Sequence, residues 1–83
     1  MKYTPKDIGE TIKSTRKRMG VTQKDLALTS GTGLRFIIEL EKGKPTCEIG
    51  KVLSVLQTLG ITITLVAPSS VRDAGANPKA KGA

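Results

Sequence analysis

Four glycines divide the first sixty residues of the chain, and their spacing is the strongest constraint on its fold. They are Gly20, Gly31, Gly43 and Gly60. Each follows a stretch in which apolar residues recur every three or four positions, the spacing of one face of an α-helix. A glycine in that place can adopt the left-handed conformation that closes many helices. The pattern therefore predicts four short helices joined by connections of a few residues.

The first two helices also carry start signals. Thr4 stands before Pro5, a residue that suits the first helical position, and Asp7 completes a Thr-x-x-Asp pattern related to the capping box. Thr22 and Asp25 repeat this arrangement ahead of the second helix. We therefore expect threonine N-caps at both positions.

The other two helices have weaker start signals. Thr32 or Gly33 serves as N-cap of a third helix that runs to about Lys42, and Thr46, after Pro45, marks the start of the fourth. Leucine, isoleucine and valine must make most of the core, because aromatic residues are 2% of the chain. The residues expected to face the core are Ile8, Ile12, Thr15, Met19, Leu26, Ala27, Phe36, Ile37, Leu40, Ile49, Val52, Leu53, Leu56 and Leu59, with Leu28 as a further candidate.

After Gly60 the period changes from that of a helix to that of a strand. Apolar and polar residues alternate through Ile61, Thr62, Ile63, Thr64, Leu65 and Val66. A single strand leaves an exposed edge that invites pairing with another copy of the chain. We expect this strand to pair across a homodimer; the alternative is an extended segment that lies over the helices of a monomer.

From residue 67 onward the composition shifts to small and polar residues. Such a segment cannot bury enough apolar surface to offset its ordering entropy. The sequence thus divides into a domain at 1–66 and a disordered basic tail at 67–83. The tail is either simply solvated or folds onto DNA or another partner.

Composition narrows the function classes. The chain has 83 residues, a formal charge of +7, no histidine and one cysteine, Cys47. Without histidine the commonest general base and the commonest zinc ligand are missing, and one cysteine cannot build a thiolate zinc site. We therefore expect no enzyme, no metal and no cofactor, and, with neither a signal peptide nor a membrane span visible, a cytoplasmic protein. Excess positive charge points to a polyanion, most often nucleic acid.

Residues 22–44 carry the functional motif, which reads TQKDLALTSGTGLRFIIELEKGK. Two short helices with a glycine between them describe a helix-turn-helix. The ordered set Thr22-Gln23-x-x-Leu26-Ala27, Gly31 and Ile37-x-x-Leu40-Glu41-x-Gly43, with Arg16 upstream, resembles the Cro/C1-type (XRE) family of DNA-binding domains from about Ile12 to Gly60. The resemblance implies an all-α, lambda-repressor-like domain of four to five short helices. It also implies that Arg16 and Glu41 form the family's internal ion pair.

The third helix supplies the residues expected to read bases. On a helical wheel, Leu34, Arg35, Ile38 and Glu39 turn away from the core. Arginine can bind guanine through two hydrogen bonds, leucine and isoleucine can touch thymine methyl groups, and glutamate can accept from cytosine N4. The alternative is that Leu34 and Ile38 contact another protein.

Phosphate contacts are expected at both ends of the motif. Amides at a helix N-terminus and basic side chains suit phosphate oxygens. The candidates are Thr22, Gln23, Lys24, Lys42, Gly43 and Lys44.

A helix-turn-helix followed by a Leu-Gly-Ile-Thr-Ile-Thr-Leu strand resembles HipB-type antitoxins. This resemblance implies a homodimer on palindromic double-stranded operator DNA, repression of its own operon, and binding to a HipA-type serine/threonine kinase toxin. Two alternatives remain open: a phage- or plasmid-type repressor without a toxin partner, and a protein-interaction module on the same scaffold.

Overall fold

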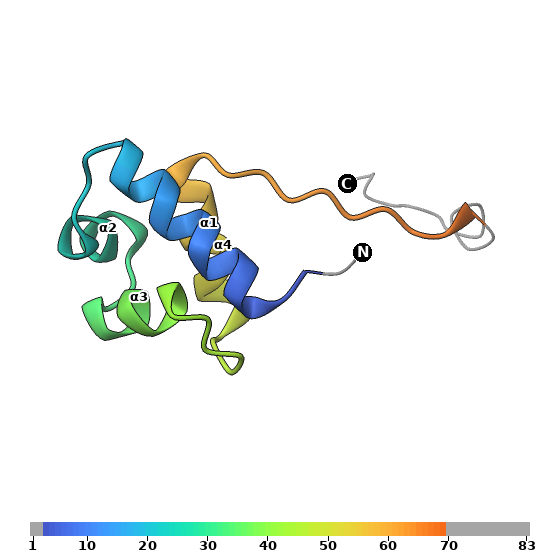
Figure 1. Ribbon diagram of the computed structural model, residues 1–83, viewed down its shortest axis with the longest axis horizontal. Coiled ribbons are helices and arrows are strands. Elements are labelled where there is room, and N and C mark those ends of the chain that lie inside the picture. Colours follow the sequence, from blue (N-terminus) through green and yellow to red (C-terminus); the bar gives the residue numbers. More distant parts are fainter. Residues whose placement is uncertain (1–2, 70–83) are drawn as a thin grey trace.

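The computed structural model describes residues 3–69. The described chain folds into four helices: α1 (Pro5–Arg18), α2 (Gln23–Ser30), α3 (Leu34–Glu41) and α4 (Ile49–Leu59). They pack into one compact body from which the segment after α4 extends (Figure 1). The expected all-α class is confirmed.

Each helix ends one or two residues before its predicted glycine. The backbone φ of Gly20, Gly31, Gly43 and Gly60 is 73°, 73°, 89° and 75°, which is the left-handed region. At each end, the residue after the glycine donates its backbone N–H to a carbonyl five residues earlier, the signature of the Schellman motif. The four bonds are Val21 to Arg16 (3.1 Å), Thr32 to Ala27 (3.1 Å), Lys44 to Glu39 (3.1 Å) and Ile61 to Leu56 (2.9 Å).

The first two helix starts also follow the sequence. The Thr4 hydroxyl accepts the Asp7 N–H at 3.1 Å, and the Thr22 hydroxyl accepts the Asp25 N–H at 3.0 Å. Each aspartate in turn accepts the N–H of its threonine, which completes two capping boxes. Gly33 is the N-cap of α3.

The expected start of the fourth helix near Thr46 is wrong. α4 begins at Ile49 with Glu48 as its N-cap, which makes no side-chain capping bond. Pro45 and Thr46 instead form a turn, and Cys47 packs against the core. This stretch carries the chain from the end of α3 back to the core before α4 can begin.

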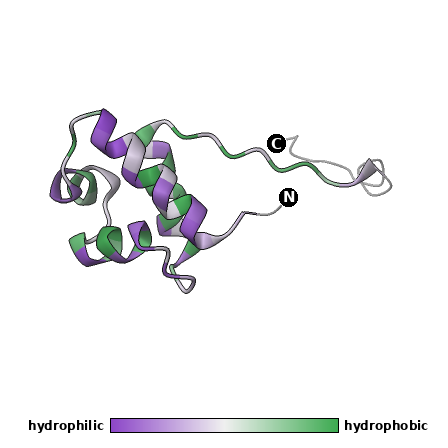
Figure 2. Cartoon of the chain, viewed as in Figure 1, coloured by the Kyte–Doolittle hydropathy of each residue, from purple (hydrophilic) through white to green (hydrophobic). Residues whose placement is uncertain are grey.

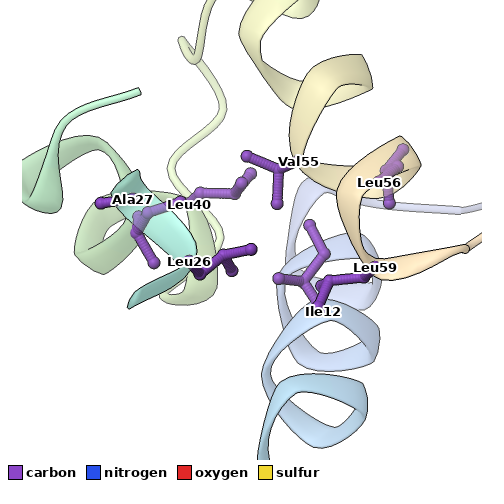
Figure 3. Packing of buried hydrophobic residues seen from close by; sticks show 8 residues of the cluster. Ile12, Leu26, Ala27, Leu40, Val55, Leu56 and Leu59 are labelled. Carbon is purple, nitrogen blue, oxygen red and sulfur yellow. The ribbon is translucent and has the colours of Figure 1, made fainter. Parts of the chain in front are cut away.

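The core lies where all four helices meet (Figure 3). Its buried members are Ile12, Leu26, Ala27, Ile37, Leu40, Val55, Leu56 and Leu59. Val55 is fully buried although the sequence pattern did not select it. Met19, Leu28, Ile49 and Leu53 are exposed, contrary to expectation. The error in α4 arises because apolar residues occur around most of its circumference, so periodicity alone does not identify the buried face.

A buried glycine in α1 sets the distance between α1 and α3. A Cβ on Gly9 would collide with the carbonyl oxygen of Leu40 and lie 3.0 Å from that of Glu41. The backbones of the two helices therefore approach without an intervening side chain. The sequence pattern did not predict this packing role, because it used only the glycines at helix ends and Gly9 lies inside α1.

Residues 61–66 are extended and have neither helical nor strand structure in the described chain. The segment runs outward from the end of α4, with apolar and polar residues alternating along it (Figures 1 and 2). Between it and α1 lies a groove of about 1040 Å³, lined among others by Ile8, Leu56 and Ile63. The strand and its pairing across a dimer are therefore not present in the single chain. Most of the expected tail, residues 70–83, lies outside the described residues.

Candidate nucleic-acid interface

α2 and α3 form the two arms of the helix-turn-helix. Only three residues, 31–33, separate them, and the left-handed Gly31 makes this short reversal possible. Leu26 and Ala27 of α2 and Ile37 of α3 are buried where the arms meet the core. The arrangement fixes α3 on the outside of the domain with one face free.

A buried polar network anchors α3 from behind. Arg16 donates from Nε to Glu41 Oε2 at 2.7 Å, from Nη2 to Glu41 Oε1 at 3.1 Å, and from Nη1 to the carbonyl of Val21 at 2.8 Å. The side chains of Arg16 and Glu41 are 9% and 3% exposed. The hydrogen bonds to Glu41 raise the pKa of Arg16 above its ordinary value. A paired, bidentate geometry is what a buried arginine and carboxylate require.

The network has a third member that sequence reasoning missed. Gln23, at the start of α2, donates its amide Nε2 to Glu41 Oε1 at 3.0 Å. Gln23 was expected to face phosphate, but its amide nitrogen here joins α2 to the Arg16–Glu41 pair. No local pattern announces this contact, because Gln23 and Glu41 are 18 residues apart. The network thus connects the end of α1, the start of α2 and the end of α3.

The opposite face of α3 is turned toward solvent. The Arg35 side chain is 89% exposed and Leu34 is 43% exposed, while Ile38 and Glu39 are half-buried. These four residues share the outer surface, as the helical wheel predicts. Ile37, Leu40 and Glu41 are buried on the inner side.

Three charged residues meet on this outer surface. Glu39 Oε1 accepts from Lys44 Nζ at 2.9 Å, and Glu39 Oε2 accepts from Arg35 Nε at 3.4 Å. The hydrogen bond from Lys44 is the main cause that lowers the pKa of Glu39 below its ordinary value. We call Arg35, Glu39 and Lys44 the α3 charge cluster.

The remaining phosphate candidates divide into two kinds. Lys24 and Lys42 have exposed side chains that can reach a polyanion. The Thr22 hydroxyl and the Gly43 amide already have partners within the chain: Thr22 accepts from Asp25, and Gly43 donates to the Leu40 carbonyl at 3.0 Å. In this state basic side chains, rather than that hydroxyl and amide, are available to phosphate.

Within residues 3–69, no group of three or more histidine, cysteine, aspartate or glutamate residues could hold a metal ion. In the same part of the chain no helix has the length and apolar character needed to cross a membrane.

Comparison with known proteins agrees with this geometry. The family described as Helix-turn-helix domain matches residues 9–67. The HTH-type transcriptional regulator y4mF of Sinorhizobium fredii is 54% identical over 69 residues, which are 83% of this chain and 91% of that protein.

Two solved structures with a HipB chain have a similar fold. The HipB chain of the HipB-O4 20mer complex matches with a TM-score of 0.72 and 25% identity, over 81% of this chain and 94% of that one. A HipA-HipB-O2-O3 complex gives the same TM-score of 0.72 and 25% identity over the same shares, 81% and 94%. The chain therefore belongs to the XRE-type helix-turn-helix family of transcriptional regulators, with a fold like that of HipB.

Proposed function

We propose that this protein is a sequence-specific repressor that inserts α3 into the major groove of operator DNA. The observation that carries the proposal is the two-sided character of α3. Its inner side is locked by Arg16, Gln23 and Glu41, while its outer side presents Leu34 and Arg35 to solvent. A rigid helix with exposed base-reading side chains is what major-groove recognition needs.

Individual contacts follow from the side chains on that surface. Arg35 has the donors for a guanine, Leu34 and Ile38 offer apolar contacts for thymine methyl groups, and Glu39 can accept from cytosine N4. Lys24, Lys42 and Lys44, together with the N-terminus of α2 at Thr22 and Gln23, lie beside the backbone phosphates. Gly43 contributes by forming the turn that positions Lys42 and Lys44.

The operator is palindromic and the protein binds it as a homodimer. The apolar, unpaired segment 62–66 supports this, because an exposed edge of alternating Ile, Thr and Leu is a template for pairing with a second copy. Pairing of this segment across a two-fold axis brings two copies of α3 into successive major grooves, about 34 Å apart.

The biological role we propose is that of an antitoxin. Its support is the likeness to HipB, which has been solved together with HipA and O2-O3. By extension, this protein represses its own operon and neutralises a HipA-type serine/threonine kinase by binding it.

Fluorescence anisotropy with DNA from upstream of its own gene tests the repressor role. We expect Arg35→Ala to weaken binding to that DNA by about ten-fold or more while binding to a scrambled duplex of equal length changes little, since a lost bidentate base contact costs about 1–3 kcal/mol. Equal binding of both duplexes by the unchanged protein would contradict sequence-specific recognition and favour an interaction module.

The antitoxin role needs a separate experiment. The protein is co-expressed with a HipA-type kinase, for which a reading frame next to its gene is the first candidate, and the complex is purified and its kinase activity measured. We expect a stable complex with suppressed phosphorylation. DNA binding without any such complex would instead identify a phage- or plasmid-type repressor.

A further inference from the structure

The α3 charge cluster places a carboxylate at the centre of a surface that should attract DNA. Of the charged side chains on the outer face of α3, Glu39 is the acidic one, and both of its oxygens are engaged by cations. A phosphate oxygen would compete for the same two donors, Lys44 Nζ and Arg35 Nε. In the free protein, the Glu39 carboxylate therefore accepts from the same two donors that a DNA phosphate would otherwise engage.

The cluster is held by the backbone as well as by charge. Gly43 reverses the chain after α3, and the Lys44 N–H donates to the Glu39 carbonyl at 3.1 Å. This Schellman closure brings the Lys44 side chain back over the last turn of α3, where its ammonium meets Glu39. Because the backbone at the end of α3 already places the Lys44 side chain near Glu39, formation of the ion pair costs little conformational entropy.

The contact of Arg35 with Glu39 uses only the Nε of the guanidinium group. Its Nε donates to Glu39, and its side chain is 89% exposed. The two terminal nitrogens are thus free to address guanine O6 and N7 while Nε stays on the carboxylate. Glu39 orients this guanidinium for a base without blocking it.

Glu39 acts differently on phosphates and on bases. A phosphate that approaches the cluster is repelled by the Glu39 carboxylate and has to replace that carboxylate as the partner of Lys44. A base edge carries no net charge, so it is not repelled and does not have to displace the carboxylate. Selection by a repulsive element against the wrong partner is a recognised route to specificity.

We propose that Glu39 is a specificity-determining residue, an internal counter-ion that suppresses non-specific binding to the DNA backbone and orients Arg35 toward a base. The proposal rests on the proposed function, since it assumes that α3 faces DNA. It adds that the ratio of operator affinity to non-specific affinity depends on this carboxylate.

The test compares Glu39→Gln with Glu48→Gln, which changes the net charge equally at the exposed N-cap of α4. We expect Glu39→Gln to tighten binding to scrambled DNA about five-fold beyond the control, because glutamine no longer competes with phosphate for Lys44. The salt dependence on scrambled DNA should become steeper by about one unit of slope, because Lys44 then binds phosphate without leaving a carboxylate. Operator binding should tighten less than binding to scrambled DNA, because the variant also loses the carboxylate that orients Arg35, so the specificity ratio falls.

A double-mutant cycle isolates the role of Lys44. In a Lys44→Gln background, Glu39→Gln should no longer steepen the salt dependence. Persistence of the full change there would show that the effect does not pass through Lys44 and would overturn the proposed mechanism.

The outcomes separate this proposal from the function on which it rests. If the unchanged protein prefers its operator but Glu39→Gln behaves like Glu48→Gln on scrambled DNA, the role of Glu39 is refuted and the repressor function stands. Equal tightening on operator and scrambled DNA also refutes it. Failure of the unchanged protein to bind any DNA refutes both.

Discussion

The carboxylate of Glu41 receives three hydrogen bonds, two from Arg16 and one from Gln23, in a site that water hardly reaches. Because both charges are buried, each depends on the other for compensation. Removal of one partner leaves an uncompensated buried charge, which costs far more than loss of a surface ion pair. This network couples α3 to α1 and to the start of α2.

We therefore predict that Glu41→Gln lowers the free energy of unfolding by about 3 kcal/mol, because Arg16 keeps its charge in a buried site. Glu48→Gln is the matched control, since Glu48 is exposed and its oxygen lies 3.9 Å from Lys51 Nζ. The control should change stability by less than about 0.5 kcal/mol. Urea denaturation of both variants provides the comparison, and similar losses in the two would argue against the buried network.

A second prediction at this scale concerns two of the helix-terminating glycines. Gly20 and Gly43 both have positive φ, but a Cβ on Gly43 would also lie 2.8 Å from Cα of Lys6, whereas the space around Gly20 is open. Gly20→Ala should destabilise the protein by about 1 kcal/mol, the cost of a left-handed alanine. Gly43→Ala should cost at least twice as much, because the backbone of the first turn of α1 must also move. Equal costs in chemical denaturation would show that this close approach is relaxed in solution.

At the scale of elements, α1 and α3 meet at Gly9, where backbone approaches backbone. This contact determines how deeply α3 sits and therefore how far its outer face projects. The same contact aligns Glu41 with Arg16 across the interface. An apolar side chain at this position would fill space that the carbonyls of Leu40 and Glu41 already occupy.

We predict opposite effects for alanine at two helical glycines. Gly9→Ala should destabilise the fold by about 2 kcal/mol, since α1 and α3 must separate to admit the methyl group. Gly50→Ala, at an open site in α4, should be neutral or stabilise by up to about 1 kcal/mol through its helix propensity. Thermal unfolding followed by circular dichroism measures both, and stabilisation by Gly9→Ala would contradict the packing.

At the scale of the whole molecule, the apolar surface of the extended segment stands out against a small core. Leu65 and Val66 are 91% and 72% exposed, and Ile63 is 46% exposed. A domain of about 60 residues buries only about 60% of the surface of its unfolded chain, so a second copy that covered this segment would add stability that one copy lacks. The groove between residues 61–65 and α1 offers the space for it.

We predict that a chain ending at Ile61, which keeps the bond from Ile61 to Leu56, is a folded monomer, while the full chain is a dimer. Within the full chain, Ile63→Lys should weaken the dimer more than Thr64→Lys, because the apolar side chain loses buried area and the threonine loses little. Sedimentation velocity over a range of concentrations distinguishes these states. A dimer of unchanged affinity in the shortened chain would refute pairing through this segment.

The sequence by itself determined the number of helices, their ends and two of their starts, because these depend on hydrogen bonds between residues three to five positions apart. Gly43 with Lys44 and Thr22 with Asp25 are examples whose partners lie in the same short stretch. It also determined the family, since the helix-turn-helix spacing is an ordered local pattern.

Tertiary structure alone decided which face of α4 is buried, why residue 9 is glycine, and where the amide of Gln23 points. Val55 rather than Leu53 enters the core because α1 and α2 approach α4 from that side, which no property of α4 itself specifies. Gln23 meets Glu41 across 18 residues because α2 and α3 fold back on each other. Contacts of this kind depend on how whole helices pack against one another, and no short-range pattern in a single sequence predicts them.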